Sequence, residues 1–263
     1  MPQPEHLDPS AYAAGGGAIG VLLIHGFPGS AAETRPMGEY LADRGLTVRC
    51  PLLPGHGTRP EDLIGVRWQA WAAEAEAALV DLQARCREVF VGGLSLGSLL
   101  TLWLGAGHAE ITGLVPMAPA VKIDSPLVPL TVALRHVIKY VPPAALPKGD
   151  LADPKASDRI WCYDKTPMWG AGEVYRLQRE VLQALPEIRQ PVLIFQGRLD
   201  TSVDPQAAQI LYDRIGSADK ELVWLEQSGH NLLVDAEREK VWARSYEWMM
   251  AHTEKAEGPG PSA

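Results

Sequence analysis

Apolar residues along the chain follow two patterns, which predict two kinds of secondary structure. Short apolar runs that lead into turns, such as residues 20–25 and 89–92, predict buried strands. Segments whose apolar residues recur every three or four positions, such as residues 68–82, predict helices. The expected strands cover residues 20–25, 46–50, 89–92, 111–118, 192–196 and 221–225. The expected helices cover residues 37–44, 68–82, 96–106, 173–185, 204–215 and 235–249. This alternation predicts an α/β fold with a mostly parallel sheet flanked by helices on both faces.

The strand and helix alternation is interrupted once. Residues 119–190 are rich in proline and apolar residues at first, then acquire helical spacing, and show no clear signal for a parallel strand. We expect this stretch to be an inserted helical cap, or lid, on a core made of residues 1–118 and 191–251. Residues 252–263 are polar and rich in Gly, Pro and Ala, a composition typical of a flexible tail.

Charge and cysteine content narrow the classes of function. The 263 residues carry 24 Lys and Arg against 32 Asp and Glu, a formal charge of −8 that would repel a phosphate backbone, so no nucleic-acid partner is expected. Three cysteines without a CxxC pair or a histidine at ligand spacing indicate neither a disulfide framework nor a metal site, and they fit a reducing, cytoplasmic setting. The chain shows no secretory leader and no basic amphipathic helix, so no stable membrane anchor is expected.

A candidate nucleophile lies in the turn Gly93-Leu94-Ser95-Leu96-Gly97. An apolar strand precedes this turn and an apolar helix follows it, which is the context in which a strained corner exposes a serine hydroxyl. Glycines on either side remove Cβ atoms that would clash at such a corner. The competing interpretation is a glycine-rich packing turn with an inert serine, and the strand-turn-helix context favours the nucleophile.

A serine nucleophile needs a base that is oriented by an acid, and the chain has seven histidines to weigh. Four lie in tails, at a helix end or in the insertion, and are expected to be structural or solvated: His6, His108, His136 and His252. His25 and His56 lie in glycine-containing turns, where hydrogen bonds that fix the turn are the expected role. His230 directly follows the last strand, at the edge where open α/β sheets build their sites. His230 is therefore the expected base.

Two aspartates compete for the role of the acid. Asp200 follows the strand VLIFQG at the same sheet edge, whereas Asp204 precedes Pro205 and a helical run and is explained as a helix cap. We therefore favour Asp200. The resulting chain order, Ser95 then Asp200 then His230, is the order found in α/β-hydrolases.

The motifs also resemble a known family. The segments LLIHGFPGS, PLLPGHG, VGGLSLGS, VLIFQGRLD and LEQSGHNLLVD are similar to the bacterial carboxylesterase and monoacylglycerol lipase branch of the α/β-hydrolase superfamily. The similarity extends from about residue 19 to residue 250 and is weak in the insertion. The resemblance implies a serine esterase without a cofactor, with an oxyanion hole formed by the backbone N–H groups of Phe27 and Leu96. It also implies that Asp164, in Tyr163-Asp164-Lys165-Thr166-Pro167, is a buried acid that accepts hydrogen bonds from the glycerol hydroxyls of a substrate. An exposed charge at a helix end is the alternative for this residue.

We expect the substrate to be a small acyl ester of short to medium chain length, including monoacylglycerols. The same residues could instead cleave another acyl bond, such as a thioester, or a carbon–carbon bond. A receptor that has kept the fold without catalysis is the third alternative, and the complete Ser95, Asp200 and His230 set speaks against it. Apolar residues of the insertion, among them Leu130, Leu134 and Val137, could line an acyl tunnel or pack the cap on the core. A monomer or a weak homodimer is expected.

Overall fold

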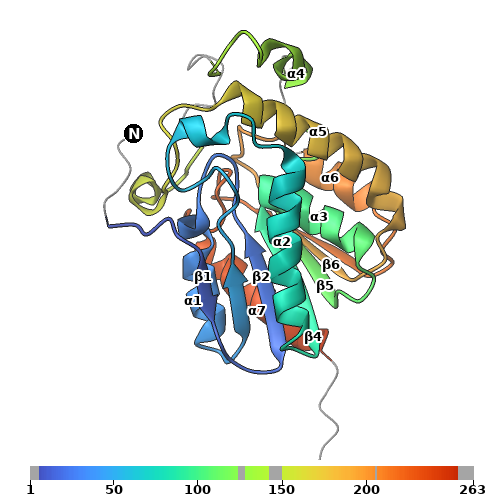
Figure 1. Cartoon of the computed structure of the whole chain (residues 1–263). Helices are drawn as coiled ribbons and strands as arrows, with labels where there is room; N and C mark the ends of the chain where they lie inside the picture. Colours follow the sequence, from blue (N-terminus) through green and yellow to red (C-terminus); the bar gives the residue numbers. More distant parts are fainter. Residues whose placement is uncertain (1–5, 124–127, 142–149, 205, 254–263) are drawn as a thin grey trace, which may run out of the picture.

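The computed structural model describes residues 6–123, 128–141, 150–204 and 206–253, and these residues form one sheet with helices on both of its faces (Figure 1). The sheet has seven strands in the order β1-β3-β2-β4-β5-β6-β7. Their bounds are β1 Tyr12–Ala14, β2 Ile19–Ile24, β3 Thr47–Cys50, β4 Glu88–Leu94, β5 Gly113–Met117, β6 Val192–Gly197 and β7 Lys220–Leu225. All neighbouring strands are parallel except β1, which pairs antiparallel with β3 at the edge. The mostly parallel sheet is confirmed, whereas β1 was not expected.

The helices are α1 Arg35–Ala42, α2 Trp68–Gln83, α3 Leu96–Gly107, α4 Thr131–Leu134, α5 Met168–Ala184, α6 Gln206–Arg214 and α7 Arg238–Ala251. Two separate apolar clusters form the core, one on each face of the sheet. One cluster joins the sheet to α2, α3, α5 and α6, and the other joins it to α1 and α7. Each expected helix is present, and α2 begins at Trp68 as predicted. No helix in the described ranges is long and apolar enough to cross a membrane.

The predicted cap region contributes helices of two kinds. The short α4 lies at the top of the view in Figure 1. Leu130, Leu134, Val137 and Ile138, in and beside this helix, are exposed and belong to neither apolar cluster, so the structure does not support packing of these side chains on the core. Helix α5 instead packs against α3 and α2, and its buried residues belong to the same apolar cluster as those helices. The second half of the region therefore shares a core with the sheet. Its division at residues 119–190 into a separate unit stays a prediction.

Strand β4 lies at the centre of this architecture. It pairs with β2 on one side and β5 on the other, and all seven of its residues are buried. The carboxyl ends of β2, β4, β6 and β7 point to the same edge because these strands are parallel. Helix α3 starts two residues beyond the end of β4, so the turn between them lies in the middle of that edge.

Candidate active site

Ser95 occupies the tight turn between β4 and α3 in a conformation that few residues adopt. Its φ is 55° and its ψ is −107°, a region that is costly for a residue with a side chain. The flanking glycines make the turn possible. A Cβ on Gly93 would lie 2.4 Å from the backbone of Gly97, and one on Gly97 would lie 2.0 Å from the Ile24 carbonyl oxygen. Only glycine fits either position, as the sequence pattern predicted.

Two backbone segments lie close to this serine, the start of α3 and the loop after β2. Leu96 is the first residue of α3, and the N–H groups of a first helical turn have no partner within the helix. They also lie at the positive end of the helix dipole. The loop after β2 approaches the same point, because a Cβ on Gly26 would lie 3.6 Å from the Ser95 Cβ. Phe27 follows Gly26 in that loop, so the two residues expected to form the oxyanion hole both come from segments next to Ser95.

His230 and Asp200 form a pair at the same edge of the sheet. Asp200 comes from the loop after β6, and His230 comes from the loop after β7. The His230 Nδ1–H donates to Asp200 Oδ2 over 2.9 Å, which leaves Nε2 as the ring atom able to take up a proton. The same carboxylate accepts from Gln196 Nε2 at 2.8 Å and from the backbone N–H groups of Ser202 and Val203 at 2.9 Å each. Asp200 is thus held in place on both of its oxygens.

The two partners shift each other's pKa values. Burial by itself would raise the pKa of Asp200, but the His230 charge and the donated hydrogen bonds outweigh it, so the pKa lies below its ordinary value. Burial by itself would lower the pKa of His230, but the Asp200 charge and hydrogen bond outweigh it and raise the pKa above its ordinary value. Asp150 and Glu33 add to this increase. The site therefore stabilises a protonated imidazole.

Asp204 and the two turn histidines have the structural contacts that were expected. Asp204 Oδ1 accepts from the Gln206 N–H at 2.8 Å at the start of α6, as a helix cap does, while Pro205 lies outside the described residues. The Leu53 N–H donates to His25 Nε2 at 3.1 Å, so His25 Nδ1 carries its hydrogen and donates to the Gly26 carbonyl at 2.8 Å. His56 Nδ1 lies 3.3 Å from the Pro54 carbonyl oxygen.

Asp164 is exposed in the structure. The expectation for this residue was a buried acid close to the substrate, and the structure instead gives it the setting of a surface charge. Its contact with glycerol stays a prediction.

Three polar residues around the pair were not anticipated from the sequence. Gln196 orients Asp200, and Glu33 is buried beneath the loop after β2, where its Oε2 accepts from the Gly26 N–H at 3.1 Å. Asp150 lies against both the acid and the histidine. The available signal for Gln196 was an amide in the otherwise apolar segment VLIFQG, and Glu33 had only the weaker signal of the one charged residue in GSAAET. No local pattern distinguishes Asp150, because its partners are distant in the chain.

Comparison with known proteins gives a consistent family. The family model described as serine aminopeptidase, S33 (Hydrolase_4) matches residues 19–237. A thermostable monoacylglycerol lipase from Bacillus sp. strain H-257 is 35% identical over 92% of this chain and 94% of its own length. A carboxylesterase from Bacillus subtilis strain 168 is 31% identical over 92% of this chain and 96% of its own. A solved structure from a report on two metagenome-derived lipolytic enzymes, LipS and LipT, superposes on this chain with a TM-score of 0.84 at 32% sequence identity. The superposition covers 93% of this chain and 98% of the other chain.

Proposed function

Because this chain belongs to the Hydrolase_4 family of serine α/β-hydrolases, we propose that it hydrolyses carboxylic esters with Ser95 as nucleophile, His230 as base and Asp200 as orienting acid. The observation that carries the proposal is the hydrogen bond from His230 Nδ1 to Asp200 Oδ2, at 2.9 Å. This bond selects the ring tautomer in which Nε2 can accept a proton, and it places a negative charge where an imidazolium would form. The strained turn at Ser95 is an independent reason to regard that serine as the nucleophile.

The first half of the reaction transfers the acyl group to the enzyme. The Ser95 hydroxyl attacks the ester carbonyl carbon while His230 Nε2 takes its proton, and the carbonyl oxygen becomes an oxyanion. The backbone N–H groups of Phe27 and Leu96 donate hydrogen bonds to that oxyanion. The imidazolium then gives its proton to the leaving alcohol, which departs and leaves an ester on Ser95.

The second half releases the acid. Water attacks the acyl carbon as His230 Nε2 takes one of its protons, and the oxyanion forms again between the same two N–H groups. The tetrahedral intermediate then collapses, Ser95 leaves with the proton held by His230, and the free carboxylic acid is released. Asp200 remains ionised throughout, in agreement with the lowered pKa of its carboxyl group.

The substrate class is supported by the relatives. The two Bacillus proteins are named for monoacylglycerols and for carboxylic esters, and each aligns with almost the whole chain. We therefore propose acyl esters of short to medium length, with monoacylglycerols among them. The exposed position of Asp164 gives no structural support to recognition of glycerol by that residue.

The test is a panel of initial rates with the wild-type chain and Ser95→Ala. The panel holds p-nitrophenyl esters from C2 to C16, 1-monoacylglycerols, an acyl thioester and an amino-acid anilide. The last substrate is included because the family description names an aminopeptidase. Ester hydrolysis that Ser95→Ala abolishes supports the proposal. Preference for the thioester or the anilide would assign the same nucleophile to another acyl bond, and a wild type inactive on every substrate would favour a receptor.

A further inference from the structure

Asp150 brings together the two loops that carry the proposed acid and base. We call residues 198–203, after β6, the acid loop, and residues 226–235, after β7, the histidine loop. Asp150 Oδ1 accepts from the Thr201 N–H at 2.8 Å, and Oδ2 accepts from the Ser202 hydroxyl. The backbone carbonyl of the same residue accepts from the His230 N–H at 3.1 Å. One residue thus contacts the acid loop through its side chain and the histidine loop through its main chain.

The contact between Asp150 and the histidine loop is so close that no residue larger than glycine fits at position 229. A Cβ on Gly229 would lie 2.3 Å from the Asp150 carbonyl oxygen, so the residue before His230 must be glycine for this approach. The segment that carries Asp150 therefore packs directly against the backbone of the catalytic histidine.

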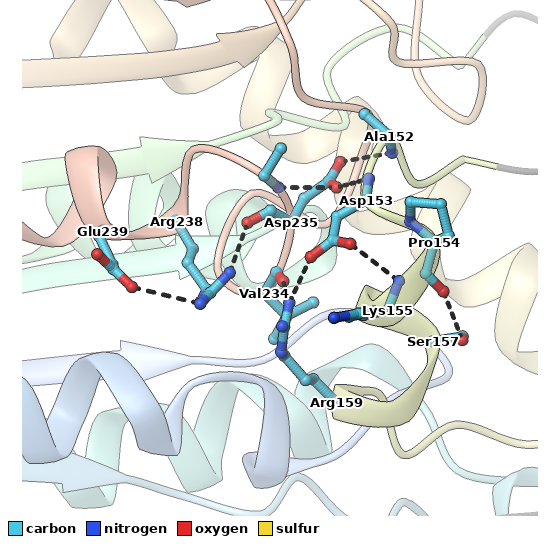
Figure 2. Close-up of polar contacts among 11 residues, drawn as sticks. Ala152, Asp153, Pro154, Lys155, Ser157, Arg159, Val234, Asp235, Arg238 and Glu239 are labelled. Atoms are coloured by element: carbon cyan, nitrogen blue, oxygen red, sulfur yellow. Dashed lines mark hydrogen bonds and ion pairs between the residues drawn. The ribbon is translucent and has the colours of Figure 1, made fainter.

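A second aspartate anchors this segment from the other side. Asp235 is fully buried at the end of the histidine loop, and its carboxylate accepts from the N–H groups of Ala152 and Asp153 at 3.0 and 2.7 Å (Figure 2). It also accepts from the Gly229 N–H at 2.7 Å. Asp235 therefore fixes residues 152–153 to the residue just before His230. Figure 2 shows that the Asp153 side chain points elsewhere, toward Lys155 and Arg159.

The Asp150 carboxylate also adds charge beside the base. Asp150 and Asp200 each place a carboxylate oxygen, and His230 places a ring nitrogen, so that these three atoms lie within 4.8 Å of one another. His230 thus faces three acids: Asp200 on its own sheet edge, Asp150 from the segment before α5, and Glu33 from beneath the loop after β2.

We propose that Asp150 is a positioning residue of the active site, which holds the acid loop and the histidine loop in register and supplies a second negative charge beside His230. This inference rests on the proposed function, because it assumes that His230 is the base. It assigns a catalytic consequence to a residue of the predicted cap region. Asp150 acts through Asp200 and His230 and has no reacting atom of its own.

Four variants separate the two roles of the carboxylate. Asp150→Ala removes both the hydrogen bonds and the charge, while Asp150→Asn keeps an oxygen acceptor and removes the charge. Ser202→Ala removes one hydrogen bond and keeps the charge. Asp153→Asn is the matched control, because it removes an acid from the same segment whose side chain faces Lys155 and Arg159. The readouts are kcat and KM on p-nitrophenyl butyrate, the pH profile of kcat/KM, and the rate of labelling by a fluorophosphonate.

We expect Asp150→Ala to lower kcat by about 10- to 100-fold with KM changed by less than about threefold, since small misplacements of catalytic groups cost rate and not binding. Asp150→Asn should move the acid limb of the pH profile to lower pH by about half a unit to one unit, because a negative charge that favours protonated His230 is gone. Ser202→Ala and Asp153→Asn should leave that limb in place.

The outcomes distinguish this inference from the proposed function. If the wild type neither hydrolyses esters nor reacts with the fluorophosphonate, both fail. If the wild type reacts and the Asp150 variants match Asp153→Asn in kcat and in the acid limb, only the role of Asp150 is overturned. Should Asp150→Ala fail to fold, Asp150→Asn decides: an unmoved acid limb contradicts the proposal and a shifted one supports it.

Discussion

Asp200 and Asp204 lie four positions apart in the chain, yet their side chains have different partners. Asp200 accepts from His230, and Asp204 accepts from the first N–H of α6 and pairs with Lys122. The proposed mechanism therefore assigns catalysis to only one of them. This difference allows a matched comparison at the level of single residues.

Asp200→Asn should lower kcat by about 10³- to 10⁴-fold, because an amide at this position can favour the wrong ring tautomer and cannot stabilise an imidazolium. Asp204→Asn should change kcat by less than about threefold, since an asparagine also caps helices. Steady-state rates on a soluble p-nitrophenyl ester measure both. Equal losses in the two variants would contradict the assignment of the acid.

Glu33 is a second residue whose charge has measurable consequences. Glu33 is only 5% exposed, and burial raises the pKa of its carboxyl group from 4.5 to about 7 despite the hydrogen bond from the Gly26 N–H. In the unfolded chain the carboxyl group loses its proton near its ordinary pKa, whereas in the folded protein it keeps the proton to near neutral pH. Folding therefore takes up a proton between these two values, and the contribution of Glu33 to stability falls as pH rises through this window.

Glu33→Gln should remove this pH dependence. A difference of this size between the folded and unfolded pKa corresponds to about 3 kcal/mol in the free energy of unfolding. Relative to wild type, the free energy of unfolding of the variant should therefore rise by up to about 3 kcal/mol between pH 5 and pH 8. His25, whose burial lowers its pKa to about 4, contributes a dependence of the opposite sign, but it is present in both chains and cancels. Urea unfolding at four pH values tests this, and a difference that stays constant with pH would show that Glu33 does not titrate as described.

At the level of elements, the geometry of the nucleophile depends on how closely α3 approaches β2. Gly97 lies in the first turn of α3, where a Cβ would meet the carbonyl oxygen of Ile24 at 2.0 Å. Strand β2 leads directly into the loop that contains Phe27, so a displacement at this point would move the proposed oxyanion hole. Gly107 ends the same helix with nothing within 4 Å of its Cβ position.

Gly97→Ala should therefore lower kcat by at least about 100-fold and destabilise the fold by about 1–3 kcal/mol, the usual cost of overpacking. Gly107→Ala is the control on the same helix. It should leave kcat unchanged and stability unchanged or raised by up to about 1 kcal/mol. Rates and thermal unfolding of the two variants provide the comparison. A Gly97→Ala variant with wild-type kcat would show that the close approach is not required.

At the scale of the whole molecule, the sheet and its main helices were predictable because their patterns are local. Long periodic segments such as α2 and apolar runs such as β4 carry their own signal. Strand β1 was missed because it has only three residues, Tyr12–Ala14, and is held by pairing with β3 at the edge. A strand of that length shows no usable alternation.

The residues of the proposed site also differ in whether a local sequence pattern predicts them. Ser95 lies in a recognisable turn, and Asp200 and His230 follow predictable strands. Asp150 Oδ1 instead accepts from the Thr201 N–H, which lies 51 positions away in the chain. No local pattern encodes such pairs, so only the folded structure could reveal them. For the same reason the sequence left open whether Asp164 is buried or exposed.

The central claim of this account is that Ser95 becomes covalently acylated, and one measurement tests it most directly. The folded chain is treated with a fluorophosphonate and examined by mass spectrometry, intact and after digestion with trypsin. We predict one adduct per chain, located on Ser95 and not on the neighbouring Ser98, and absent from Ser95→Ala. An unmodified wild type, or an adduct that persists in Ser95→Ala, would contradict the account.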